Sequence, residues 1–239
     1  MTVNLLSSNV LEWIKVACQS LTDCLFPPTC LGCHDLLAPS QQDLCANCWV
    51  CFEKMSCTDK SVSRRLPNGL PLHWSSAPLY FTPKSRVARL LYGLKYRYNP
   101  GAALRLGRWC GRAFSNRFSH QEVDLILPVP LHPLRASARG YNQSERLAQG
   151  IAEVIERPSK KKWLIRVRNT PSQSQLSGSQ RFQNVANGFQ LTEKAAVKGR
   201  HILLVDDLLT SGATIMACIA PLMEAQVGKI SLAVLAITK

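Results

Sequence analysis

No apolar run in this chain of 239 residues reaches the ~18–20 residues that a membrane-spanning helix needs. The first residues also lack the basic stretch followed by an uninterrupted apolar stretch that marks a secretory signal. We therefore expect a cytoplasmic protein. Hydrophobic residues make up 46% of the chain, which is enough for the core of one large domain or two smaller ones.

Acidic residues are missing from two long stretches. The segment Lys60–Gln121 contains twelve Lys or Arg and no Asp or Glu, and Arg157–Thr192 carries seven more basic residues and again no acid. These stretches account for much of the formal net charge of +14. Such surfaces attract polyanions, whether nucleic acid, phosphorylated metabolites or anionic lipid, although the same charge can serve only to keep a surface solvated.

Ten cysteines in a chain without a secretory signal favour metal binding over a disulfide scaffold, which a reducing compartment disfavours. Eight of the ten precede residue 58, and four of them form two Cys-x-x-Cys pairs separated by eleven residues. Each pair can present two thiolates to one tetrahedral ion, and four thiolates leave no open position, so the predicted ion is structural. Cys51 and Cys57 lack a second pair and remain spare thiols or substitute ligands. The expected ligands of Zn²⁺ are Cys30, Cys33, Cys45 and Cys48.

A polar loop follows an apolar strand in the segment "HILLVDDLLTSGATIMACIA", residues 201–220. The loop has no Lys for a Walker P-loop and no G-x-G-x-x-G for a dinucleotide. In a parallel sheet, "HILLV" delivers Asp206 and Asp207 to the carboxyl edge, where ligands bind. The turn from Thr210 to Thr214 precedes a helix and can hold a phosphate with backbone N–H groups and hydroxyls. Because two carboxylates repel phosphate, we expect them to hold ribose hydroxyls or a hydrated Mg²⁺.

Continuous apolar strands separated by amphipathic helices predict a parallel sheet covered on both faces. Helices are expected over "SRVARLLYGLKYRY" with a Ser85 cap, over 102–118 after a break at residues 99–101, and after an Asn142 cap. We expect Tyr92 and Trp109 to belong to the core faces of their helices. The expected strands are "APLYFT", "VDLILPVP", "WLIRVR", "HILLV" and "ISLAVLAI". The predicted divisions are an amphipathic N-terminal helix (1–26), a zinc ribbon (27–60), a linker (61–74) and an α/β domain (75–239).

The strand, the two acids and the Thr/Ser-rich loop resemble the phosphoribosyl pyrophosphate motif of the phosphoribosyltransferases. The resemblance implies that Asp206 and Asp207 hold the ribose hydroxyls, with Mg²⁺ accompanying the pyrophosphate. It also implies a type I phosphoribosyltransferase-like fold. The implied 5′-phosphate ligands are Thr210, Ser211, Gly212, Ala213 and Thr214.

Three further segments narrow the resemblance. "LPVPLHPLRASARGYNQSERLA", "RVRNTPSQSQLSGSQRFQNVANGF" and "FPPTCLGC…LCANCW" occur in an order that resembles the ComF/GntX family of competence-associated phosphoribosyltransferase-like proteins. The resemblance covers nearly the whole chain from Phe26 onward. It departs from the family in one respect, since only Cys51 and Cys57 remain where relatives often carry a second cysteine set.

Two of these segments can also be interpreted from their residues. Arg135 and Arg139 offer planar guanidinium groups that can bind pyrophosphate bidentately and stabilise it as a leaving group. The polar, Ser/Gln-rich segment after residue 168 suits a hood that closes over a ligand, unless it is merely disordered. The hood residues that we select as candidates are Gln173, Arg181 and Asn184.

We expect a protein that binds phosphoribosyl pyrophosphate with Mg²⁺ and handles incoming single-stranded DNA during DNA uptake. Three activities are considered beside this expectation, and the first two are compatible. The first is transfer of a phosphoribosyl group to a nitrogenous acceptor, for which no acceptor pocket can be named. The second is binding of single-stranded DNA during DNA uptake, through the basic and aromatic residues between 86 and 114. The third is a zinc-ribbon adaptor that recruits a helicase or channel component, with the helix from Leu11 to Leu25 as its docking surface.

Overall fold

The computed structural model describes residues 27–55, 72–115, 122–167 and 188–239, together with the single positions 10, 13, 62, 66 and 70. The expected helix at 1–26 therefore lies almost wholly outside the described residues, as do Cys57 and the predicted hood residues Gln173, Arg181 and Asn184. Within the described segments, no helix has the length and apolar character needed to cross a bilayer.

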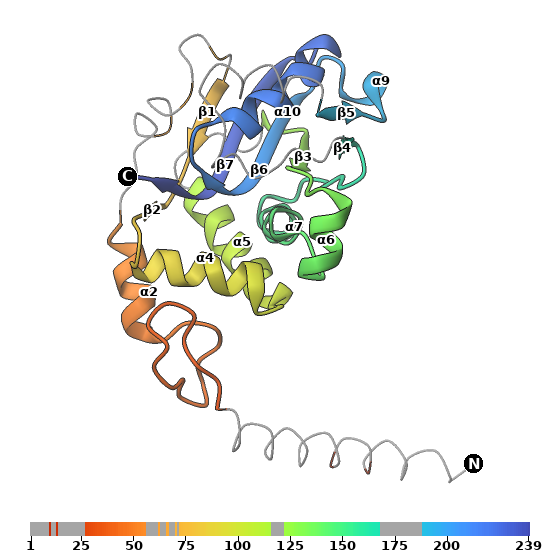
Figure 1. The fold of residues 1–239 in the computed structure, drawn as a ribbon. Helices are drawn as coiled ribbons and strands as arrows, with labels where there is room; N and C mark the ends of the chain where they lie inside the picture. The colour runs from red at the N-terminus through yellow and green to blue at the C-terminus, as the bar shows by residue number, and fades with distance from the viewer. Residues whose placement is uncertain are drawn as a thin grey trace, which may run out of the picture.

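A parallel sheet forms the centre of the fold (Figure 1). Its strand order is β1-β7-β6-β3, and β2 extends the β1 edge by pairing with a later part of β7. All of these pairings are parallel, as the sequence predicted. The strands are β1 (Leu72–Ser76), β2 (Leu79–Phe81), β3 (Leu125–Pro128), β6 (His201–Leu209) and β7 (Lys229–Thr238).

Both faces of the sheet are buried, which explains why its strands are apolar throughout. Alternate side chains of β6 enter different cores: Leu203 and Val205 pack with the helices before residue 156, and Ile202 and Leu204 pack with α10 (Ala213–Glu224). Because side chains alternate across a strand, each face needs its own apolar set. The predicted parallel sheet covered on both faces is confirmed.

Three helices cover the first face, namely α4 (Arg86–Tyr96), α5 (Pro100–Ser115) and α7 (Gln143–Ile155). The predicted caps are present, since Ser85 accepts a hydrogen bond from the Ala88 backbone N–H and Asn142 accepts one from Ser144. The predicted break at residues 99–101 is shorter than expected. Asn99 caps α5 by accepting from the Ala102 N–H, so Pro100 occupies the first helical position, where proline is favoured.

Helices α5 and α7 cross at very close range. A Cβ added to Gly150 would lie 2.2 Å from the Leu104 carbonyl oxygen, and one added to Gly107 would lie 2.3 Å from the Leu147 carbonyl oxygen. No larger side chain fits at either position without moving a backbone. The crossing therefore fixes α7, whose first residues reach the carboxyl edge of the sheet.

The cysteine-rich segment 27–55 ends in α2 (Ala46–Glu53) and packs on α4. The Arg89 Nε donates a hydrogen bond to the Gly32 carbonyl oxygen at 2.6 Å, and Leu31 lies against Gly93. Phe52 is fully buried in the same core as α4 and α5. The segment is thus continuous with the core of the sheet's first face.

Several details differ from the sequence prediction. The segment "WLIRVR" does not join the main sheet, because β4 (Leu164–Arg166) pairs antiparallel with the unpredicted strand β5 (Phe189–Leu191). Strand β1 begins inside the range expected for a linker, and Val62 and Leu66 in that range are buried. The described segments also contain the short helices α6 (Pro133–Arg139) and α9 (Lys194–Val197). The division into domains stays a prediction.

Tyr92 was predicted to lie in the core but is 61% exposed. The apolar face of α4 consists of Val87, Leu90, Leu91 and Leu94, and Tyr92 lies on the opposite side of the helix. The prediction is wrong because the angular position of a residue around the helix axis, and not the size of its side chain, decides whether it faces the core. Trp109 is half-buried and packs against the first core.

Candidate functional site

The two predicted acids, Asp206 and Asp207, lie where β6 extends beyond the end of the neighbouring strand β3. Strand β6 does not stop at Val205, as the sequence suggested, but continues to Leu209 because β7 pairs with it to Ile237. On its other side β3 ends at Pro128, opposite Val205. Asp206 and Asp207 therefore remain in extended backbone beyond the end of β3, at the open carboxyl edge of the sheet.

A pocket of about 380 Å³ opens at this edge, within the range typical of small-molecule sites. Its walls come from five parts of the chain: the C-terminal end of α4, the loop after β3, α6 with the start of α7, the end of β4, and the segment 206–214. Of the predicted ligand residues, the structure brings Arg139, Asp206, Asp207, Thr210 and Thr214 to this pocket.

Asp206 and Asp207 have different partners. The Asp206 Oδ1 accepts hydrogen bonds from the Ser144 hydroxyl at 2.8 Å and from the Asp207 backbone N–H at 2.9 Å. The Asp207 Oδ2 forms an ion pair with the Lys95 Nζ at 2.9 Å. Lys95 comes from α4, so one ion pair joins the covering helix to the acids.

Burial and the neighbouring Asp207 charge raise the pKa of Asp206 to about 7, against the opposing effects of Ser144 and Lys95. Asp206 therefore takes up or releases a proton near neutral pH. A cation or a hydroxyl group placed beside it favours the ionised form.

The loop that follows the acids leads directly into α10. Gly212 has φ of 77°, a conformation that favours glycine, and it precedes the first residue of the helix. Gly212 is the N-cap residue and has no side chain with which to cap this N-terminus. Backbone N–H groups of the first turn are therefore available to an anion, and Thr210 and Thr214 line the pocket beside them.

Basic side chains reach the pocket from three elements, namely Lys95 on α4, Arg139 on α6 and Arg166 on β4. The Arg139 guanidinium donates to the Gln143 Oε1 at 3.3 Å and lies 5.6 Å from the centre of the Tyr96 ring. Arg135 lies in α6, but its side chain is outside the described residues. The arrangement combines cations for phosphate groups with acids for hydroxyl groups or a metal ion.

Sequence reasoning missed three pocket residues. Lys95 was noted only as part of a basic surface, and Arg166 only as part of a strand. Ser144 lies in the predicted helix after Asn142, but its bond to Asp206 depends on how that helix packs. Within the predicted loop, Ser211 is exposed, while Gly212 and Ala213 are buried.

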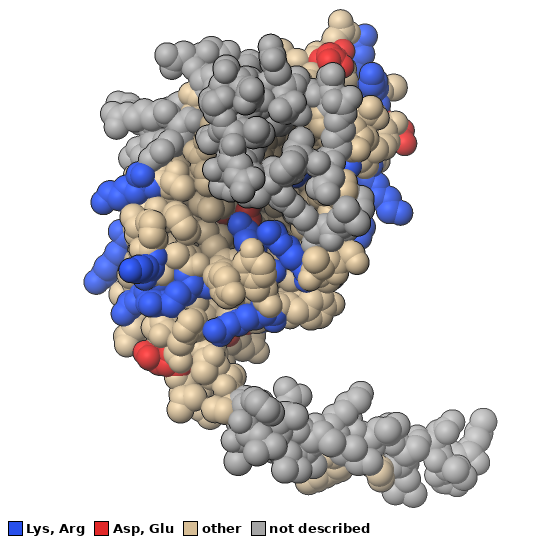
Figure 2. All heavy atoms as spheres, viewed as in Figure 1, with Lys and Arg blue, Asp and Glu red and all other residues tan. Residues whose placement is uncertain are grey.

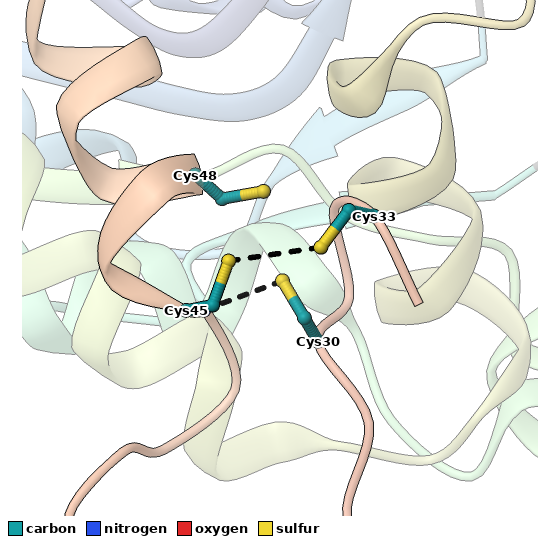
Figure 3. Close-up of side chains that lie close together, drawn as sticks. All are labelled: Cys30, Cys33, Cys45 and Cys48. Atoms are coloured by element: carbon teal, nitrogen blue, oxygen red, sulfur yellow. Dashed lines mark hydrogen bonds between the residues drawn. The ribbon is translucent and has the colours of Figure 1, made fainter. Parts of the chain in front are cut away.

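A second candidate site is formed by Cys30, Cys33, Cys45 and Cys48, whose sulfur atoms all lie within 4.8 Å of one another. Figure 3 shows the four side chains converging from two turns of the chain. The Cys33 and Cys45 sulfurs are 3.6 Å apart, and the Cys45 backbone N–H donates to the Cys30 sulfur at 3.3 Å. The described cysteines are all free thiols. This cluster can hold a metal ion such as Zn²⁺.

The thiols of this cluster differ in pKa. Burial raises the pKa of Cys33 to about 11 and raises that of Cys48 further. For Cys30, burial is outweighed by backbone N–H groups, including that of Cys45, and the pKa is lowered to about 6. Because neighbouring thiolates repel one another, a cation is needed before all four can ionise together. Cys51 lies in α2 but is not part of the cluster.

Sequence comparison finds relatives that match part of this chain. Competence protein F of Haemophilus influenzae is 38% identical over 93 residues, which cover 38% of this chain and 41% of that protein. The DNA utilization protein YhgH of Salmonella typhimurium is 39% identical over 95 residues, covering 40% and 41%. Competence protein ComFC of Bacillus subtilis is 34% identical over 114 residues, covering 46% and 44%. The match thus spans less than half of each relative's length. No family model matches.

Two solved structures align with part of this chain. Glutamine phosphoribosylpyrophosphate amidotransferase from B. subtilis, complexed with ADP and GMP, aligns with a TM-score of 0.41 and 19% identity over 60% of this chain and 30% of that one. A structure described as the allosteric regulatory enzyme of purine biosynthesis aligns with a TM-score of 0.42 and 21% identity over the same shares. The predicted α/β fold with a four-cysteine cluster is confirmed by the strand pairing and the sulfur positions themselves. The relatives named above support the predicted resemblance to the ComF family.

Proposed function

We propose, with the resemblance to the ComF family as our premise, that this chain binds phosphoribosyl pyrophosphate with Mg²⁺ and handles incoming single-stranded DNA in the cytoplasm during DNA uptake. The observation that carries the ligand proposal is the meeting of two acids, three cations and an uncapped helix N-terminus in one pocket. The names competence protein F and DNA utilization protein YhgH, given to relatives, support the DNA proposal.

Each part of the proposed ligand has a chemical counterpart in the pocket. The carboxylates of Asp206 and Asp207 suit the vicinal ribose hydroxyls, which donate hydrogen bonds. The segment from Thr210 to Thr214 suits the 5′-phosphate, because backbone N–H groups and hydroxyls surround the N-terminus of α10. The guanidinium of Arg139 suits the pyrophosphate. The same acids suit the Mg²⁺ that accompanies it, since Mg²⁺ prefers oxygen ligands.

We assign the four-cysteine cluster to Zn²⁺. Four thiolates satisfy tetrahedral coordination completely, so the ion would stabilise the fold and would not meet a substrate. The cluster supports this assignment because Cys30 and Cys48 are buried in the core that α4 and α5 share. Metal binding would thus also stabilise α4, which supplies Lys95 to the pocket.

Calorimetric titration of phosphoribosyl pyrophosphate with Mg²⁺ into the zinc-loaded chain tests the ligand proposal. We expect saturable binding to the unmodified chain and none to the Asp206→Asn/Asp207→Asn variant. The Glu193→Gln/Glu224→Gln variant also removes two negative charges, but at exposed positions, and should bind with unchanged affinity. Failure of the unmodified chain to bind would refute the ligand proposal, and equal binding by the first variant would place the ligand elsewhere.

Phosphoribosyl transfer to a nitrogenous acceptor is the second candidate function. The observation that favours it is the Asp206 carboxyl, whose pKa of about 7 suits proton transfer at neutral pH. In this step the bond from ribose C1 to pyrophosphate breaks, and its electron pair leaves with the pyrophosphate. The acceptor nitrogen forms the new bond to C1 and releases its proton to the carboxylate.

Release of pyrophosphate separates the two candidates. An enzyme cleaves phosphoribosyl pyrophosphate and releases pyrophosphate when an acceptor is added. A binding protein leaves phosphoribosyl pyrophosphate intact whatever acceptor is present. Screening purines, pyrimidines and simple amines as acceptors with the zinc-loaded chain would identify the substrate class. The Asp206→Asn variant should then lose turnover at pH 8 more strongly than it loses ligand affinity.

A further inference from the structure

Two exposed tyrosines lie side by side on α4. Tyr92 and Tyr96 are 61% and 60% exposed, and their ring centres are 4.6 Å apart with an angle of 41° between the planes. They are separated by one helical turn and lie opposite the apolar face of the helix. Tyr98 is also exposed, but its ring packs edge-on against Tyr141. We call Tyr92 and Tyr96 the tyrosine surface.

The surroundings of the tyrosine surface are basic. Arg89, Lys95 and Arg97 lie on or directly after the same helix, and the Arg139 guanidinium lies over the Tyr96 ring. The helices α4, α5 and α6 contain no Asp or Glu at all. Figure 2 shows Lys and Arg gathered over the half of this face that α4 and α5 occupy, with few acidic groups between them.

Exposed aromatic rings among cations match the chemistry of a single-stranded nucleic acid. Its phosphates are drawn to Lys and Arg, and its unpaired bases stack on aromatic faces whatever their sequence. A duplex keeps its bases stacked on one another and offers only its phosphates. An acidic peptide likewise offers charge but few planar groups for the two rings. Charge and ring exposure together therefore favour a single strand over these alternatives.

The tyrosine surface adjoins the ligand pocket. Tyr96 follows Lys95, whose ammonium group pairs with Asp207 inside the pocket. Arg139 contacts both places, because its guanidinium lies over Tyr96 while it donates to Gln143 in the pocket wall. A base stacked on Tyr96 would thus lie beside whatever the pocket holds.

We propose that Tyr92 and Tyr96 stack the bases of a single-stranded nucleic acid at the mouth of the ligand pocket. This inference rests on the proposed function for the presence of a single strand, and it adds which residues bind the bases and where. The strand lies against α4 and α6, with its phosphates near Arg97 and Arg139. Its bases then lie next to the site proposed for phosphoribosyl pyrophosphate.

A second aromatic and basic site on the chain provides a direct comparison. A pocket of about 570 Å³ between α2 and α5 is lined by Trp49, Trp109, Arg105, Arg108 and Arg112, together with Glu53. Its rings contact each other edge-on, with centres 5.9 Å apart, and both pack against the core. Two of its cations have acidic partners, Asp43 for Arg105 and Glu153 for Arg108, whereas among the described residues Lys95 is the one cation around the tyrosine surface with an acidic partner. These features make it the weaker candidate for base stacking.

Fluorescence anisotropy with a labelled twelve-residue oligothymidylate tests the proposal on the full, zinc-loaded chain. The Tyr92→Ser/Tyr96→Ser variant should bind roughly 10-fold or more weakly, because two stacking surfaces are lost. The slope of log affinity against log salt concentration should not change, since no cation is removed. The Tyr92→Phe/Tyr96→Phe variant keeps both rings and should keep the affinity. By contrast, Arg97→Gln should reduce the magnitude of the salt slope by about 1.

Three results would overturn the proposal. The first is an unchanged affinity in the Tyr92→Ser/Tyr96→Ser variant while Trp109→Leu abolishes binding, which would move the strand to the second pocket. The second is that a polyaspartate of the same length binds as tightly as the oligonucleotide, with an affinity that substitution of the two tyrosines does not change. The third is no binding of the oligonucleotide by the unmodified chain, which would refute the DNA part of the proposed function as well. The calorimetric test of phosphoribosyl pyrophosphate is independent of all three.

Discussion

Lys95 lies 2.9 Å from Asp207 and joins the last turn of α4 to the carboxyl edge of the sheet. Both side chains are largely buried, with 21% and 12% of their surface exposed. A buried ion pair contributes through the cost of breaking it more than through its net attraction. The pair therefore holds α4 in position over the pocket.

Removing this lysine should destabilise the fold in a pH-dependent way. The Lys95→Met variant keeps most of the aliphatic volume but leaves a buried carboxylate without its cation, at a cost of about 1–3 kcal/mol. Protonation of Asp206, whose pKa is about 7, removes the repulsion between the two acids that Lys95 offsets, so the loss should be larger at pH 8 than at pH 5. Urea unfolding at both pH values measures it. Lys229→Met, which breaks the exposed pair with Glu122, is the control and should show no comparable change. An equal loss at both pH values would mean that Lys95 acts by packing alone.

The raised pKa of Asp206 predicts how stability depends on pH. Its pKa is about 7 in the folded chain against 3.8 for an unperturbed aspartate, so the folded state binds more protons between these values. The stability that this proton contributes is complete below pH 3.8 and is lost as pH rises through 7. The Asp206→Asn variant has no such loss and retains a side-chain oxygen for Ser144.

The difference in Tm between Asp206→Asn and the unmodified chain should therefore grow as pH rises from 5 and level off above about pH 7. Each 1 kcal/mol of released repulsion corresponds to roughly 2–4 °C in a chain of this size. Thermal unfolding followed by circular dichroism measures the difference, with Glu193→Gln as the exposed control. A difference that stays constant across this range would show that Asp206 does not titrate near neutral pH.

Local sequence signals predicted much of the fold. The caps at Ser85 and Asn142 and the apolar strands are properties of short segments, and the structure contains them. The two Cys-x-x-Cys turns likewise predicted the sulfur cluster, because each turn sets its own geometry. The prediction that Tyr92 lies in the core was wrong, although Tyr92 and Tyr96 follow each other at helical spacing opposite the leucines.

Contacts between distant segments could not be predicted in this way. Lys95 and Asp207 are over one hundred positions apart, and only the packing of α4 on the sheet brings them together. The bond from Ser144 to Asp206 depends on the close crossing of α5 and α7 at Gly150. Strand β5 is three residues long, too short for an alternating pattern to be recognised.

Removal of the metal should destabilise more than the cysteine-rich segment. Cys30, Cys48 and Phe52 share one core with α4 and α5, so loss of the ion should loosen that core as a whole. We expect one Zn²⁺ per chain in the purified protein and a lower Tm after chelation. The Cys48→Ser variant should lose the metal, whereas Cys51→Ser should keep one equivalent, as measured by elemental analysis. Two equivalents per chain, or metal loss in Cys51→Ser, would contradict the assignment of four ligands.

Arg139 predicts a coupling between the pocket and the tyrosine surface. Its guanidinium lines the pocket and also lies 5.6 Å from the centre of the Tyr96 ring, so we expect an anion in the pocket to draw it away from that ring. An anion that attracts Arg139 therefore frees one face of Tyr96 for a base. Mg²⁺ bound with the anion reduces its repulsion of the strand. We expect pyrophosphate with Mg²⁺ to increase oligonucleotide affinity, by roughly 5-fold.

Linkage requires the oligonucleotide to raise the affinity for pyrophosphate by the same factor, which gives two independent measurements of one coupling. Anisotropy at increasing pyrophosphate and calorimetry at saturating oligonucleotide provide them. In Arg139→Gln both affinities should fall, because a cation is lost, and the coupling factor should approach 1. Arg146→Gln, which removes a cation that bonds to Gln149 on α7, should leave the factor unchanged. If pyrophosphate instead displaces the oligonucleotide, the two ligands compete for one set of cations. Arg139 then binds either pyrophosphate or the strand, but not both at once.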